Sequence, residues 1–137
     1  MDCDGESIQA TGWSDETLRK PTPKTTDALL KKLNSDSRKT RLNALKLFSL
    51  YSEAFQTEQK YAYQELEPSE QHYCDVVPRE LRPLLQDRDA DIRAMAALAL
   101  GFTCRQRKTI DALTYGFKNE SDQTAKIYMA WAIARQF

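Results

Sequence analysis

The sequence predicts an all-α fold in which six helices form three consecutive pairs. Apolar residues recur at spacings of three and four through most of the chain, as they do on the buried face of an amphipathic helix. No segment longer than a short fragment alternates apolar and polar residues between turn signals, as a half-buried strand does. A residue pattern that occurs three times along the chain is typical of stacked helix pairs.

The first 23 residues are predicted to form an N-terminal arm, which is either flexible or docked on the rest of the chain. Polar residues, glycines and prolines dominate this segment, and its large apolar side chains include Trp13 and Leu18. Residues 24–137 are predicted to form a single domain, because the helical pattern begins there and the length suits one core.

The first helix pair is expected in residues 24–56. Thr25 or Thr26 is suited to cap the first helix, since a hydroxyl oxygen can accept a hydrogen bond from a free backbone amide. A second, long helix is expected to begin near Asp36 or Ser37.

A long connection is predicted for residues 57–77, where aromatic and polar residues show little periodicity. The second pair, residues 78–103, is expected to open with Pro78 at a first helical position, which needs no amide hydrogen. The third pair is expected in residues 106–137.

The repeat appears when the sequence is compared with itself. A shift of 52 residues places 33–49 on 85–101 and matches Arg41 with Arg93, and a further shift of 33 matches Arg93 with Lys126. Each copy has an acidic or Ser/Asn turn, an early basic residue in the next helix and a run of small and apolar residues. The basic residue is placed to pair with the acidic turn of an adjacent copy, and such pairs would form a ladder along the stack.

The segment LLQDRDADIRAMAALALG, residues 84–101, closely resembles the HEAT-like repeat of the phycobilisome-lyase type. The resemblance covers about residues 24–137, with 57–77 as an insertion, and the flanking copies depart from the pattern at Thr40 and Ala134. It implies a short α-solenoid, an α-α superhelix of about three HEAT-like pairs, that acts as a non-catalytic scaffold for protein binding. Some relatives attach or remove bilin chromophores and others bind damaged DNA. The alternatives are therefore an accessory subunit of a bilin lyase-like enzyme and a nucleic-acid-binding protein.

Three alternating aspartates, Asp87, Asp89 and Asp91, superficially resemble the start of a calcium loop. Such a loop needs a glycine where this chain has Ile92 and a glutamate where it has Leu98. Capping of a helix by Asp89 and an interaction of Asp91 with the helix dipole are the better interpretation, so no metal and no cofactor are predicted.

The cysteines and the single histidine do not point to catalysis. Cys3, Cys74 and Cys104 lie far apart in the sequence, so they are expected to be reduced thiols in a cytoplasmic protein. His72 lies near Cys74, but sequence neighbours rarely form a nucleophile and base, and no glycine-rich phosphate loop is present. No catalytic residue is assigned.

The charge distribution argues against nucleic acid as a partner. The net charge is zero, although residues 18–46 carry nine bases and two acids and residues 53–91 carry four bases and ten acids. Residues 1–17 carry five acids and no base. No apolar run is long enough for a membrane span, and the first residues are unlike a signal peptide.

Two surfaces are predicted to bind protein. The first is a groove along the second helix of each pair, with basic candidates Arg41, Lys46, Arg93 and Lys126. The second is an apolar patch on the last helix, with candidates Tyr128, Met129, Trp131, Ile133 and Phe137. A second copy of the chain, forming a homodimer, or the N-terminal arm through Trp13 and Leu18 is expected to cover this patch.

Overall fold

The computed structural model describes residues 22–58 and 66–137, and every regular element in these ranges is a helix. The prediction of an all-α fold is confirmed for them, whereas Trp13, Leu18 and Cys3 lie outside the described residues. The elements in chain order are α3 (Pro23–Lys32), α4 (Arg38–Glu58), α5 (Pro68–Leu81), the 3-10 helix η2 (Arg82–Gln86), α6 (Ala90–Phe102), α7 (Arg107–Asn119) and α8 (Gln123–Gln136).

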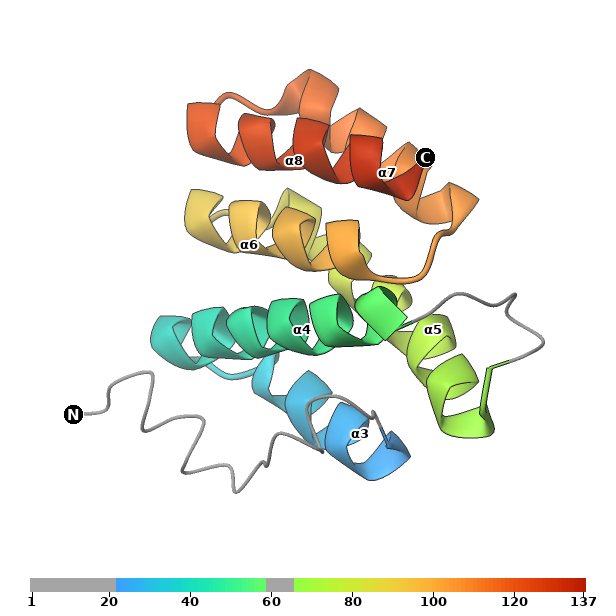
Figure 1. The fold of residues 1–137 in the computed structure, drawn as a ribbon. Coiled ribbons are helices and arrows are strands. Elements are labelled where there is room, and N and C mark those ends of the chain that lie inside the picture. The colour runs from blue at the N-terminus through green and yellow to red at the C-terminus, as the bar shows by residue number, and fades with distance from the viewer. Residues whose placement is uncertain (1–21, 59–65) are drawn as a thin grey trace.

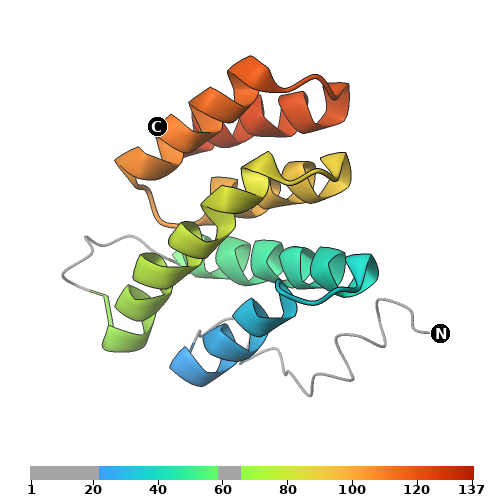
Figure 2. The ribbon, with the colours of Figure 1, turned by 180° about the vertical axis from the view of Figure 1, so that it is seen from behind.

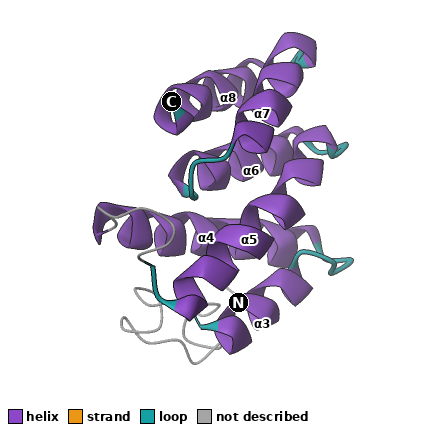
Figure 3. Ribbon diagram, turned by 90° about the vertical axis from the view of Figure 1, so that its right-hand side faces the viewer, coloured by secondary structure: helices purple, strands orange, loops and turns teal. Residues whose placement is uncertain are grey.

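The helices lie in two layers. Helices α4, α6 and α8 lie side by side in one layer, with α6 packed between α4 and α8 (Figure 1). Helix α3, helix α5 with η2, and helix α7 form the second layer, which Figure 2 shows from behind and Figure 3 from the side. Each member of the first layer therefore follows a member of the second in the chain.

The first pair begins slightly earlier than the sequence indicated. Thr22 caps α3, because its Oγ1 accepts a hydrogen bond from the Thr25 amide at 3.1 Å, and Pro23 occupies the first helical position. The predicted cap was therefore wrong by one helical turn. At the start of α4 the Ser37 Oγ accepts a hydrogen bond from the Thr40 amide at 3.1 Å, as the sequence predicted.

The predicted connection of residues 57–77 contains most of α5, and this is the largest correction to the expected helices. Pro68 is the first residue of the helix, and the Glu67 amide donates a hydrogen bond to Glu70 Oε1 at 3.0 Å. Pro78 is not the start of this helix but lies inside it.

Pro78 is tolerated inside α5 because another residue satisfies the carbonyl that it leaves free. A proline cannot donate to the carbonyl four residues earlier, which here is that of Cys74. The Gln106 Nε2 donates to this carbonyl oxygen at 2.7 Å. A residue of the loop after α6 thus compensates for the proline in α5.

Cys74 and Cys104 form a disulfide, with Cα atoms 5.5 Å apart, so the expectation of two reduced thiols was wrong. The disulfide joins α5 to the segment between α6 and α7, and its two cysteines are 30 residues apart in the sequence. His72 lies in the same helix as Cys74, and its Nε2 is 3.7 Å from Asp27 Oδ1 of α3.

A buried glutamine satisfies the free carbonyls at the end of α6. Gln136, which is 2% exposed, donates through Nε2 to the carbonyl oxygens of Leu100 at 2.9 Å and Thr103 at 3.1 Å. Its Oε1 accepts a hydrogen bond from the Gln106 amide at 3.1 Å. The end of α8 is therefore tied to the end of α6 and to the loop that follows it.

Small residues let α6 and α8 approach closely. A Cβ atom added at Gly101 would lie 2.5 Å from the Trp131 ring and 3.2 Å from the Cα of Ala132. Ala94 and Ala97 lie on the same side of α6 as Gly101, and both are buried. The core itself is formed by larger apolar side chains from both layers, including Leu29, Leu45, Phe48, Tyr73, Val77, Leu81, Ile92, Leu100, Leu113 and Met129.

The Gly101→Leu variant is expected to lose about 1–3 kcal/mol of unfolding free energy, because the larger side chain would force α8 away from α6. Urea unfolding followed by circular dichroism measures this loss. The Ala130→Leu variant is the control, since Ala130 is a small residue of α8 that is exposed, and its stability is expected to change by less than about 0.5 kcal/mol. Equal stability of the two variants would contradict the close packing at Gly101.

Candidate protein-binding face

Two arginines on successive helices of the first layer form ion pairs with acids. Each acid lies in the turn between the two helices of the next pair. Arg41 of α4 forms an ion pair with Asp87, which follows η2. Arg93 of α6 pairs with Glu120, which follows α7, through bonds of 2.7 Å from Nε and 2.8 Å from Nη2. The two arginines match in the 52-residue register and the two acids in the 33-residue register, so the predicted ladder is confirmed at two steps.

The ladder keeps its carboxylates ionised. At Glu120, the hydrogen bonds from Arg93 lower the pKa and outweigh burial, which acts to raise it. At Asp87, burial is the largest single effect and acts to raise the pKa. The hydrogen bonds from Arg41 and the Asp89 amide together outweigh it, so the pKa of Asp87 is lowered. Glu120 in turn raises the pKa of Arg93 through the same hydrogen bonds.

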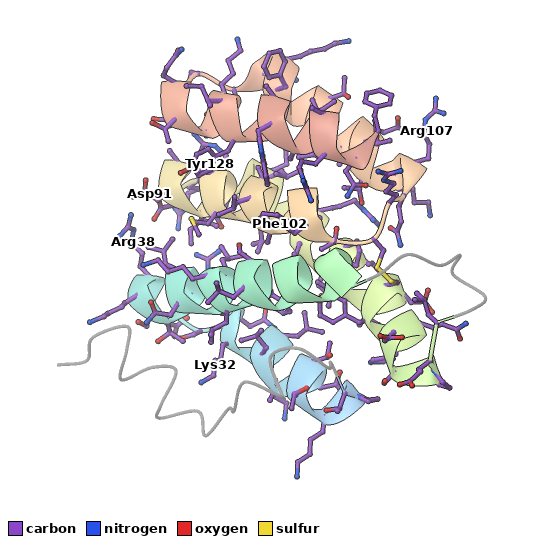
Figure 4. The ribbon with its side chains drawn as sticks, viewed as in Figure 1. Lys32, Arg38, Asp91, Phe102, Arg107 and Tyr128 are labelled. Atoms are coloured by element: carbon purple, nitrogen blue, oxygen red, sulfur yellow. A yellow bond between two sulfur atoms is a disulfide. The ribbon has the colours of Figure 1, made fainter. Side chains whose placement is uncertain are left out.

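The aspartates in the turn before α6 cap that helix and form ion pairs with arginines of α4. Asp89 caps α6, as predicted, because its Oδ1 accepts a hydrogen bond from the Asp91 amide at 2.9 Å. Arg38 pairs with both Asp89 and Asp91, and Figure 4 shows Arg38 and Asp91 at the same end of α4 and α6. The hydrogen bond from Arg38 lowers the pKa of Asp89. In the described part of the chain, no three His, Cys, Asp or Glu side chains are grouped so as to hold a metal ion.

The four basic residues predicted for the groove do not form one row of exposed cations. Arg41 and Arg93 are largely buried in the ladder. Lys126 lies over the Phe117 ring, with Nζ 5.0 Å from its centroid. Lys46 is exposed on α4. The structure therefore gives the two arginines a packing role, and their part in binding stays a prediction.

The repeat register identifies which side of each first-layer helix is turned away from the second layer. On α6 the positions Met95, Leu98 and Phe102 are partly exposed, and their spacings of three and four place them on one side of the helix. Leu100, on the opposite side, is fully buried. The three partly exposed positions of α6 and the matching positions of α4 and α8 form a surface that we call the outer face. It comprises Asn43, Lys46, Leu50, Met95, Leu98, Phe102, Tyr128, Trp131 and Arg135.

Aromatic side chains and a cation gather on the outer face between α6 and α8. The rings of Phe102 and Trp131 meet edge to face, with centroids 5.1 Å apart. The Arg135 guanidinium lies over both rings, 5.0 Å from the Phe102 centroid and 5.7 Å from that of Trp131. Figure 4 labels Phe102 of α6 and Tyr128 of α8. On α4 the same face carries Leu50, which is 48% exposed.

The apolar patch predicted on the last helix is divided between three environments. Met129 is fully buried, so its place in an exposed patch was wrong: its side chain would meet a Cβ atom added at Gly116 of α7. Tyr128, Trp131 and Ile133 are partly buried, and Phe137 is 77% exposed. The segment is apolar on nearly every side, so the sequence alone could not show which side of the helix is buried.

A hollow of about 260 Å³ lies between η2 and the end of α7. Its polar lining includes Asp87, Arg93 and Glu120, which already bind one another or other ladder residues. We therefore assign it to the packing of successive turns.

No helix within residues 22–58 or 66–137 is long and apolar enough to cross a membrane. No protein-family model matches this chain, and comparisons with curated proteins and with solved structures give no match either. The function is therefore inferred from the geometry of the chain itself.

Proposed function

We propose that this protein is a short α-solenoid of HEAT-like helix pairs that acts as a non-catalytic protein-interaction module. The three pairs are α3 with α4, α5 and η2 with α6, and α7 with α8. Two observations support this proposal: the two-layer arrangement, and the ladder of ion pairs at positions that the sequence repeat matches. The outer face of α4, α6 and α8 is the binding surface.

The observation that carries the proposal is the group of half-buried aromatic side chains beneath Arg135 on the outer face. Trp, Tyr and Arg side chains supply much of the binding energy at protein interfaces, and a partner that covers them removes apolar area from water. Leu50 extends the apolar surface onto α4, and Lys46 and Arg135 add positive charge. A protein partner with apolar and acidic side chains fits this surface.

Two substitutions on the outer face are expected to abolish binding without unfolding the protein. Leu50→Glu and Arg135→Glu both change exposed residues, and together they make the charge of the face more negative, by one unit at Leu50 and two at Arg135. The measurement is quantitative affinity capture from an extract of the source cells, with the double variant and the unchanged protein compared directly. We expect at least one protein to be enriched by the unchanged chain and reduced about tenfold or more by the double variant, which corresponds to about 1.4 kcal/mol.

Tyr115→Glu is the matched control, because Tyr115 is 59% exposed but lies on α7 in the other layer. This variant is expected to capture the same proteins as the unchanged chain. If the outer-face variant loses no protein, or if Tyr115→Glu loses the same proteins, the outer face is not the binding surface.

The compartment in which the protein acts is part of the proposal. The sequence-based prediction was a cytoplasmic protein, in which glutathione keeps thiols reduced. The bond between Cys74 and Cys104 favours an oxidising compartment instead. Alkylation of free thiols in protein purified rapidly from its source cells decides between the two.

A further inference from the structure

The side of α8 that faces away from α6 carries the same pattern as a buried side of α6. On α6, Gly101 faces α8 closely. Ala94 and Ala97 lie two turns and one turn earlier on the same side of the helix, and both are buried. The 33-residue register places Ile127, Ala130 and Ala134 of α8 at the matching positions.

These matching positions are exposed on α8. Ile127 is 56% exposed, and Ala130 and Ala134 are also exposed. An aliphatic residue followed by two alanines forms a side that a neighbouring helix can approach closely, as α8 approaches Gly101. We call Lys126, Ile127, Ala130 and Ala134 the α8 edge.

The α8 edge also carries an incomplete step of the ladder. Lys126 matches Arg41 and Arg93, each of which pairs with an acid in the turn of the next helix pair. Within the described residues, no carboxylate forms an ion pair with Lys126, which lies over the Phe117 ring instead. A ladder acid is therefore the group that would complete this step.

We propose that the α8 edge docks a helix pair of a partner protein, with an acidic residue in the turn of that pair meeting Lys126. This inference rests on the proposed stack of helix pairs and adds a second surface to it, distinct from the outer face. The partner's second helix would pack on Ile127, Ala130 and Ala134 as α8 packs on α6. Its acid would take the place that Glu120 takes beside Arg93.

Charge argues against a second copy of this chain as the occupant. In a head-to-tail contact, the ladder acid of the first pair would fall at Ser35, which has no charge. In a two-fold contact, α8 would face another α8, and residues 123–136 contain two cations and no acid. The unextended protein is therefore expected to be a monomer by analytical ultracentrifugation, and a dimer that Ile127→Asp dissociates would overturn the choice of a partner protein.

The α8 edge is tested with the chain's own third pair as the probe. A second copy of residues 105–137 is fused after Phe137, which keeps the 33-residue period and brings the copied Glu120 opposite Lys126. We expect the extended protein to unfold in one cooperative transition, at a higher urea midpoint than the original protein. An unchanged midpoint, with the added residues unfolding separately, would overturn the proposal.

Substitutions on the edge separate docking from a general effect of the extension. Ile127→Asp is expected to remove the gain in midpoint from the extended protein and to leave the original protein unchanged, because Ile127 is exposed there. Leu50→Asp is the matched control, since Leu50 is similarly exposed but lies on α4, and it is expected to preserve the gain.

A charge swap tests the ladder step itself. Lys126→Glu in the extended protein, and Glu120→Lys in the added copy alone, are each expected to lower the midpoint, whereas the two together restore it. If the double variant is no more stable than the single variants, Lys126 does not pair with the acid. The capture experiment changes Leu50 and Arg135 instead, so a failure of the α8 edge leaves the result for the outer face intact.

Discussion

Replacing Cys74 and Cys104 with serine is expected to lower the free energy of unfolding by about 3–4 kcal/mol. The disulfide closes a loop between residues 30 apart, and it restricts the unfolded chain by an entropy that grows with loop length. It also joins α5 to the loop at the end of α6, where Gln106 compensates for Pro78. Urea unfolding of the serine variant and of the unchanged protein measures the difference.

Reduction provides the control for this prediction. With dithiothreitol, the unchanged protein is expected to unfold at nearly the same urea concentration as the serine variant, and the reductant should not affect the variant. A reductant that leaves the unchanged protein as stable as before would contradict a bond between these two cysteines.

The second pair shows how far the sequence could predict the fold. The start of α6 follows from a local signal, namely Asp89 as the cap, so this cap was predicted correctly. The start of α5 was missed because Pro78 shares with Pro68, where the helix begins, a strong local preference for a first turn. What overrides that preference is Gln106, 28 residues later in the chain, and a contact of that range leaves no local pattern.

The same distinction applies to the candidate surfaces. The ladder was predictable because charge and register are both visible in the sequence, and Arg41 and Arg93 occur at matched positions. The outer face was predicted in part, as a groove along the second helix of each pair, but Phe102 and Arg135 were missed although the same register would have pointed to them. The sequence could not assign Met129 to the interior, since α8 is apolar on nearly every side and only the position of α7 decides which side is buried.

Glu120→Gln is expected to cost about 3 kcal/mol of unfolding free energy at neutral pH, because it leaves a largely buried arginine without its counter-charge. The side chain of Glu120 is 2% exposed and that of Arg93 is 18% exposed. Glu120 also accepts a hydrogen bond from the Asp122 amide at 2.9 Å. The cost stays at the lower end for a buried pair, since Arg93 keeps the carbonyl oxygens of Asp87 and Arg88 as acceptors.

The pH dependence gives this prediction a second readout. The pKa of Glu120 is lower in the folded protein than its ordinary value of about 4.3 in an unfolded chain. The stabilisation from the pair is therefore complete above about pH 4.3 and is lost as the pH falls through the folded pKa. The difference in urea midpoint between the unchanged protein and Glu120→Gln is expected to shrink as the pH is lowered from about 7 to about 3.

Glu80→Gln is the matched control, since Glu80 forms an ion pair with Arg79 in which both side chains are exposed. This variant is expected to lose less than about 1 kcal/mol, because solvent and salt screen an exposed pair. If Glu120→Gln costs no more than Glu80→Gln at neutral pH, the ladder does not stabilise the stack. A large cost for Glu120→Gln alone means that one acid per turn joins successive helix pairs, which is the same interaction that Lys126 would offer to a partner.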